Sequence, residues 1–95
     1  MSTKKAYEDK LQAQLDEWRA QIDKLKAKAD KAEADTKLRF NAEIEALRSK
    51  HDAASARLAS LREAGDDAWQ NLKSGIDMAW HTLGSAVNAA TEKFK

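Results

Sequence analysis

The sequence predicts an all-α protein, and three observations lead to this prediction. Proline is absent and glycine occurs only three times, so little in the chain interrupts a helix. Charged residues make up 35% of the 95 residues, and Lys, Glu, Asp, Arg, Ala and Leu dominate, as in long helices and coiled coils. The larger apolar residues and the alanines between them advance 24 steps over 87 residues from Tyr7 to Phe94, about 3.6 residues per step.

Residues 1–64 are expected to form one long, charged coiled-coil helix. Positions 4–64 hold 26 charged residues, often of opposite sign and four apart, as in Lys26 with Asp30. Each such pair stabilises a helix by about 0.2–0.5 kcal/mol, although most of these charges are simply a solvated helix surface. Bulky apolar side chains are too sparse and too evenly spread for a globule, so we expect each helix to pack against another helix or another chain.

Within this helix the apolar positions alternate in steps of three and four, the spacing of a coiled-coil seam. A lone helix would leave that seam in water, so we expect a homo-oligomer. A parallel dimer pairs Lys28 with Glu33, whereas an antiparallel pair centred near residue 30 pairs Lys26 with Glu33 and Lys28 with Asp35. The antiparallel arrangement is favoured because it makes more ion pairs. The predicted self-association seam consists of Leu15, Trp18, Ile22, Leu25, Ala29 and Ala32.

Residues 65–67 are a candidate hinge. The sequence Ala-Gly-Asp-Asp at 64–67 combines glycine, the commonest residue just after a helix, with aspartate, a good N-cap. Two interpretations stay open: a hairpin turn at Gly65, or a glycine tolerated inside one continuous helix at a cost of about 1 kcal/mol. The combined stop and restart signals favour a break.

Residues 68–95 are predicted to form a second, amphipathic helix. Only Lys73 and Asp77 are charged between positions 68 and 91, and an Ala-Trp-x-x-Leu repeat of eleven residues keeps its apolar side chains on one face. Such a face suits a membrane surface. It equally suits packing on residues 36–64 or on another chain, which is the commoner role. This C-terminal stripe, the candidate membrane or partner face, consists of Trp69, Leu72, Ile76, Trp80, Leu83, Val87 and Phe94.

No residue pattern points to catalysis, so we expect no enzyme activity, catalytic residues, cofactor, metal site or small-molecule substrate. His51 and His81 lack the spaced cysteines or carboxylates of a metal site, and no glycine-rich phosphate loop is present. Seventeen basic residues against sixteen acidic ones argue against nucleic acid as a partner. With no cysteine, no apolar signal segment and no membrane-spanning run, a cytoplasmic location is expected, with peripheral contact at the inner membrane as the alternative.

Three stretches carry a family resemblance: AYEDKLQAQLDEW at 6–18, IDKLKAKADKA at 22–32 and DDAWQNLKSG at 66–75. They are similar to a family of small bacterial coiled-coil proteins, some of which are labelled stress-response proteins. The resemblance spans nearly the whole chain and implies a bacterial, cytoplasmic, non-enzymatic protein without ligand residues. The expected function is therefore that of a structural stress-response protein acting by helical self-association. The alternative is a peripheral membrane or lipid-binding protein that uses the C-terminal helix.

Overall fold

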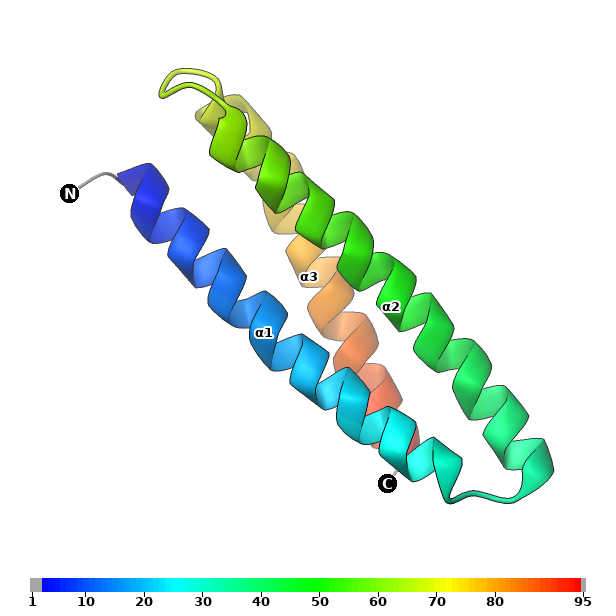
Figure 1. Ribbon diagram of the computed structural model, residues 1–95. Coiled ribbons are helices and arrows are strands. Elements are labelled where there is room, and N and C mark those ends of the chain that lie inside the picture. The colour runs from blue at the N-terminus through cyan, green and yellow to red at the C-terminus, as the bar shows by residue number, and fades with distance from the viewer. Residues whose placement is uncertain (1–2, 95) are drawn as a thin grey trace.

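A computed structural model describes residues 3–94, which form an antiparallel bundle of three helices (Figure 1). The helices are α1 over Thr3–Asp30, α2 over Ala34–Glu63 and α3 over Trp69–Lys93. The bundle is elongated, 51 by 19 by 18 Å, and α2 runs antiparallel to both α1 and α3. The prediction of an all-α protein is confirmed.

The expectation of one continuous helix over residues 1–64 is wrong. The chain turns at 31–33, and α2 returns along α1. The physical reason is that the apolar side of α1 finds its partner within the same chain, which avoids the entropy lost when two chains associate. The apolar period continues in phase through the turn, so the period by itself does not reveal the turn.

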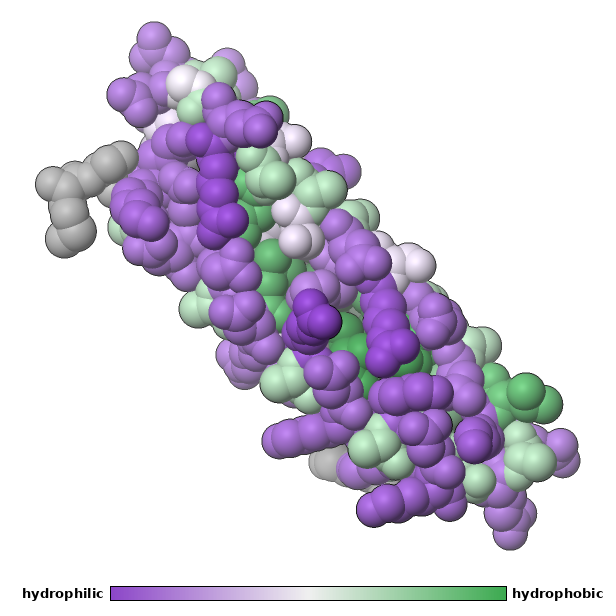
Figure 2. Space-filling model, viewed as in Figure 1, coloured by the Kyte–Doolittle hydropathy of each residue, from purple (hydrophilic) through white to green (hydrophobic). Residues whose placement is uncertain are grey.

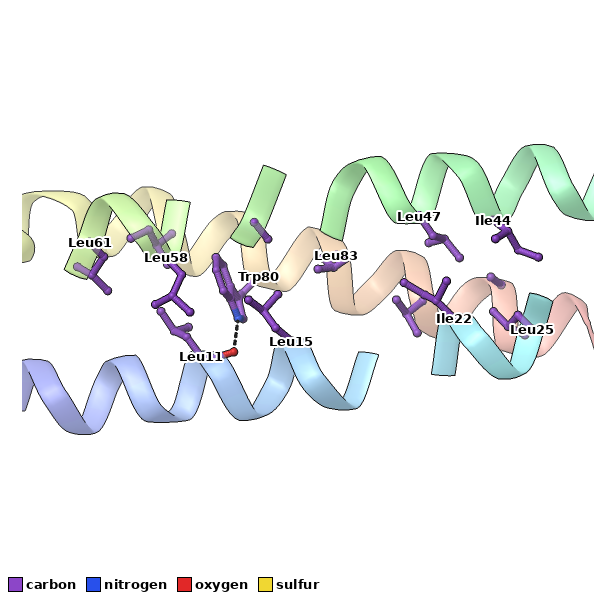
Figure 3. Close-up of a cluster of buried hydrophobic side chains, with 14 of the residues drawn as sticks. Leu11, Leu15, Ile22, Leu25, Ile44, Leu47, Leu58, Leu61, Trp80 and Leu83 are labelled. Carbon is purple, nitrogen blue, oxygen red and sulfur yellow. Dashed lines mark hydrogen bonds between the residues drawn. The ribbon is translucent and has the colours of Figure 1, made fainter. Parts of the chain in front are cut away.

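The bulky apolar residues, although sparse, converge into one core. Side chains from all three helices point toward one another along the bundle (Figure 3). Within the described chain, no polar or charged residue is buried. Burying each large aliphatic side chain contributes about 1.5–3 kcal/mol. Each helix packs against the other helices of the chain, and the side chains are not too sparse to form one core. The buried residues are Leu11, Leu15, Ile22, Leu25, Ala29, Ile44, Leu47, Ala54, Leu58, Leu61, Trp69, Ile76, Trp80, Leu83, Val87, Ala90 and Phe94.

The connection between α2 and α3 covers positions 64–68. Gly65 is exposed and does not have a positive φ angle, and its carbonyl accepts hydrogen bonds from the backbone N–H groups of Ala68 and Trp69 at 3.1 and 3.2 Å. Ala68 occupies the N-cap of α3 and makes no side-chain cap bond. The aspartates at 66 and 67 therefore do not cap α3, contrary to the role suggested by their sequence.

Hydrophilic residues cover most of the face seen in Figure 2, and hydrophobic residues show mainly along the furrow between α1 and α2. Only a few large hydrophobic side chains of the described residues are exposed. They are Leu38 and Met78, at 71% and 70%, and Leu72 at 39%. Single exposed apolar residues of this kind are common on protein surfaces.

Candidate functional site

A groove of about 370 Å³ runs between α1 and α3. α1 contributes Tyr7 and Trp18 to its wall, and α3 contributes Asp77, Trp80 and Gly84. The two helices run parallel, so residues early in α1 meet residues early in α3 and later residues meet later ones. Three contacts across this groove fix the relative position of the two helices.

The first contact joins Tyr7 to α3. The Tyr7 hydroxyl donates a hydrogen bond to Asp77 Oδ1, and Lys73 Nζ lies 3.2 Å from Asp77 Oδ2 and 5.2 Å from the centre of the Tyr7 ring. Burial raises the pKa of Tyr7 well above its usual value, and the bond to Asp77 raises it further. The same bond holds the pKa of Asp77 below its usual value, with help from Lys73 and Lys10. Near neutral pH the pair is thus a neutral donor and a charged acceptor, which suits a structural link.

The second and third contacts involve tryptophans. Trp80 donates its indole N–H to the carbonyl oxygen of Leu11 at 3.3 Å, the dashed line in Figure 3. Further along the groove, the half-buried ring of Trp18 lies against Gly84. A tryptophan buried in a core normally finds a partner for its N–H group, and here that partner is the backbone of another helix.

The predicted self-association seam lies inside the bundle. Trp18 is half-buried beside α3, and Ala32 is half-buried in the turn between α1 and α2. The argument that this seam would be left in water is therefore wrong for the folded chain. The remaining members are fully buried against the chain's own helices: Leu15, Ile22, Leu25 and Ala29.

The C-terminal stripe forms the α3 side of the same core. Its aromatic members make specific contacts: the rings of Trp69 and Tyr7 lie 5.7 Å apart, and those of Phe94 and Phe40 stack at 3.8 Å. Leu72 is partly exposed, at 39%. In the bundle the stripe is therefore packed on the chain itself and is not a free membrane face. Its buried members are Trp69, Ile76, Trp80, Leu83, Val87 and Phe94.

The pairing of α1 with α2 is nearly symmetric about their turn. Lys26 Nζ donates to Asn41 Oδ1 at 2.9 Å, close to the turn. His51 Nε2 donates to the carbonyl oxygen of Leu15 at 2.9 Å, further from it. Lys4 Nζ donates to the carbonyl oxygen of Arg62 at 3.2 Å, near the far end.

In each of these pairs the partners lie at nearly equal sequence distances on either side of the turn. Sequence reasoning missed the polar partners Asn41 and Arg62. The available signal is the favoured antiparallel arrangement, whose orientation agrees with the hairpin. Its expected pairs, Lys26 with Glu33 and Lys28 with Asp35, are not among the ion pairs of residues 3–94, and it places the partner in a second chain.

Among residues 3–94, no group of three or more His, Cys, Asp or Glu side chains is placed to hold a metal ion. None of the helices in that range is both long enough and apolar enough to cross a membrane. No protein-family model, curated protein or solved structure matches the chain. The arrangement of side chains therefore has to indicate the function by itself.

Proposed function

We propose that this protein is a non-enzymatic structural protein that works by self-association of its helices. The observation that carries the proposal is the antiparallel pairing of α1 and α2, symmetric about their turn. Because the partners are placed symmetrically, a second copy can supply α1 or α2 with the same set of contacts. The antiparallel homo-oligomer expected from the sequence and the intramolecular hairpin are two solutions for one seam.

Polar groups between the helices support a structural role. Tyr7 and Asp77 hold each other in the protonation states that their hydrogen bond requires. His51 donates a hydrogen bond to a backbone carbonyl on the neighbouring helix. A general base must be free to accept a proton near neutral pH, and these groups are instead engaged in holding helices together.

The burial of the seam supports the proposal of a role under stress. Two copies can share it only after a bundle opens, and the open fraction rises with heat or denaturing conditions. Self-association would then increase under the conditions that damage other proteins. This is the bacterial, cytoplasmic context implied by the resemblance to stress-response coiled-coil proteins, and we propose it for this chain.

Energy transfer between labelled copies tests the proposal. The chain has no cysteine, so Ser55→Cys at an exposed position of α2 gives one site for a donor or an acceptor dye. Mixed donor and acceptor copies should develop energy transfer, faster on warming, and an excess of unlabelled chain should remove it. Absence of transfer, together with a monomer mass by sedimentation at the highest concentration reached, would overturn the proposal.

Peripheral membrane binding is the second candidate, and one feature of α3 favours it. Gln70, Ser74, Ser85 and Asn88 are exposed, uncharged polar residues of α3, unlike the many charged residues exposed on α1 and α2. A helix with an aromatic apolar stripe and few charges can leave the bundle for a lipid interface. Because Trp69 and Trp80 are already buried, a blue shift in fluorescence is a poor test.

Quenching of tryptophan by brominated lipid in vesicles is a sharper test of that candidate. A Trp18→Phe variant, which keeps only the two tryptophans of α3, should be quenched and should float with the vesicles. Lack of both effects would exclude the candidate.

A further inference from the structure

The turn between α1 and α2 contains no residue that requires a turn. Its sequence is Lys31-Ala32-Glu33, three good helix formers. Glu33, the N-cap of α2, makes no side-chain cap bond, and no residue between 3 and 94 has a positive φ angle. Local sequence here favours a helix, whereas packing of α1 on α2 favours the turn. Such a conflict between local and global preference is unusual in a natural fold.

The backbone departs from a helical path over very few residues. The N–H groups of Lys31 and Ala32 donate to the carbonyl oxygens of Lys28 and Ala29 at 3.2 and 3.1 Å, so the chain stays coiled up to residue 32. Glu33 then has φ −64° and ψ 157°, an extended conformation. The ψ angle of Glu33 is therefore one backbone angle that has to change before the chain can form a continuous helix here.

The apolar positions continue in register across the turn. Ala29 is buried, and Ala32, Thr36 and Phe40 are partly buried, at steps of three, four and four residues. A straight helix would keep these side chains on one face. It would also bring Lys31 near Asp35 and Glu33 near Lys37 at helical spacing. In the hairpin, none of these four forms an ion pair with another residue of 3–94.

We propose that residues 31–33 form a hinge that becomes helical and exchanges α1 between two copies of this chain. In the extended dimer, α1 and α2 of each copy are one helix, and α1 packs on α2 and α3 of the partner. Each contact of the monomer is made again, so the core is conserved, and the hinge residues gain helical hydrogen bonds. Because two copies must associate, the fraction of chains in the extended dimer rises with protein concentration.

The exchange has a measurable effect on shape. A straight helix over 3–63 rises 1.5 Å per residue and is about 90 Å long. The monomer measures 51 Å along its longest axis. Small-angle scattering with mass determination therefore separates the extended dimer from the monomer and from bundles that associate side by side.

Ala34→Pro is a variant that blocks only the extended form. Position 34 is the first residue of α2, where proline is well tolerated, and it is exposed. The preceding residue, Glu33, already has the extended conformation that a following proline prefers. In a continuous helix, each proline costs about 3 kcal/mol, so two per dimer raise the dissociation constant roughly 10⁴-fold. Ala34→Ser, which keeps the N–H group, is the matched control.

This inference rests on the proposed self-association, and the experiment separates the two. We expect wild type and Ala34→Ser to form a dimer about 90 Å long, and Ala34→Pro to stay a monomer of wild-type helicity. A dimer of wild type that is no longer than the bundle, or one that Ala34→Pro forms equally well, would overturn the exchange and leave self-association standing. Monomers at every concentration would overturn both.

A crosslink gives a readout that does not depend on the proline variant. Lys26 and Asn41 are in contact across the hairpin, and the chain has no other cysteine to interfere. A Lys26→Cys chain is mixed with an Asn41→Cys chain, warmed, cooled and treated with a short bismaleimide linker. Covalent heterodimers support the exchange of α1 between copies, and their absence in a sample that is dimeric by mass contradicts it.

Discussion

The indole ring of Trp18 lies against Gly84 so closely that a methyl group added to the glycine would come within 2.9 Å of Trp18 Cζ2. Glycine inside a helix normally lowers stability relative to alanine, by about 1 kcal/mol. At position 84 the missing side chain lets the large ring of α1 approach the backbone of α3. Gly75, also within α3, has open space around it, since the nearest atom to an added methyl group is Arg57 Nη1 at 4.0 Å.

The first prediction compares these two glycines. Gly84→Ala should lower the free energy of unfolding by about 1–3 kcal/mol, because the Trp18 ring must move or the helices must separate. Gly75→Ala should raise it by about 0.5–1 kcal/mol through helix propensity alone. Urea unfolding of both variants measures the difference. Equal stabilisation by the two substitutions would show that the Trp18 contact does not require glycine.

The second prediction concerns the link between Tyr7 and Asp77. Tyr7→Phe removes the hydroxyl donor and leaves the ring packed beside Trp69. The free energy of unfolding should fall by about 0.5–1.5 kcal/mol, toward the lower end because water reaches this pair. In a double-mutant cycle, Asp77→Asn should lower the free energy of unfolding less in the Tyr7→Phe background than in wild type. Strictly additive effects of the two substitutions would exclude a direct interaction.

The third prediction is the pH dependence of the same pair. The pKa of Tyr7 is raised on folding, so its contribution to stability is complete below the unfolded value of 10.0 and is lost as pH rises above it. The pKa of Asp77 is lowered on folding, so its contribution is present above the unfolded value of 3.8 and is lost as pH falls below it.

Thermal unfolding of wild type and Tyr7→Phe measures the alkaline effect. The stability difference between the two proteins should shrink above pH 10, while effects of other groups are common to both. Tyr7 is the only tyrosine, so the absorbance of tyrosinate reports its ionisation directly. Titration of Tyr7 with its ordinary pKa in the folded protein would contradict this prediction.

The sequence predicts which side chains are buried. It predicts less well whether the same chain or another chain covers them. The helical period places Leu15, Ile22 and Leu25 on one apolar face, and all three are in the core. An antiparallel partner satisfies that face equally well from another chain or from the same chain after a turn. Choosing between them depends on the free energy of the turn at 31–33, for which the residues carry no local signal.

The contacts of the candidate site could not be predicted from the sequence either. Tyr7, Trp18 and Trp80 are noticeable in the sequence as large aromatic residues, but their partners are Asp77, a glycine and a backbone carbonyl from distant positions. These contacts depend on the parallel arrangement of α1 and α3. That arrangement exists only because the chain turns twice, so it could not be deduced from either segment alone.

The last prediction concerns Gly65, for which the sequence allows either a turn or a continuous helix. Gly65 is exposed, lacks a positive φ angle and would have no atom within 4 Å of an added methyl group. Gly65→Ala should therefore raise the free energy of unfolding by about 0.4–1 kcal/mol, because alanine restricts the unfolded chain.

Stability alone does not show whether the turn is kept or whether alanine joins α2 and α3 into one helix that packs on another chain. The contact between Trp69 and Tyr7 does, since it exists only while the chain turns back on itself. In a Gly65→Ala chain whose other tryptophans are replaced by phenylalanine, Trp69 should keep its buried fluorescence and the longest dimension should stay near 51 Å. A red shift of the Trp69 fluorescence together with a longer particle would instead mean that the turn between α2 and α3 requires glycine.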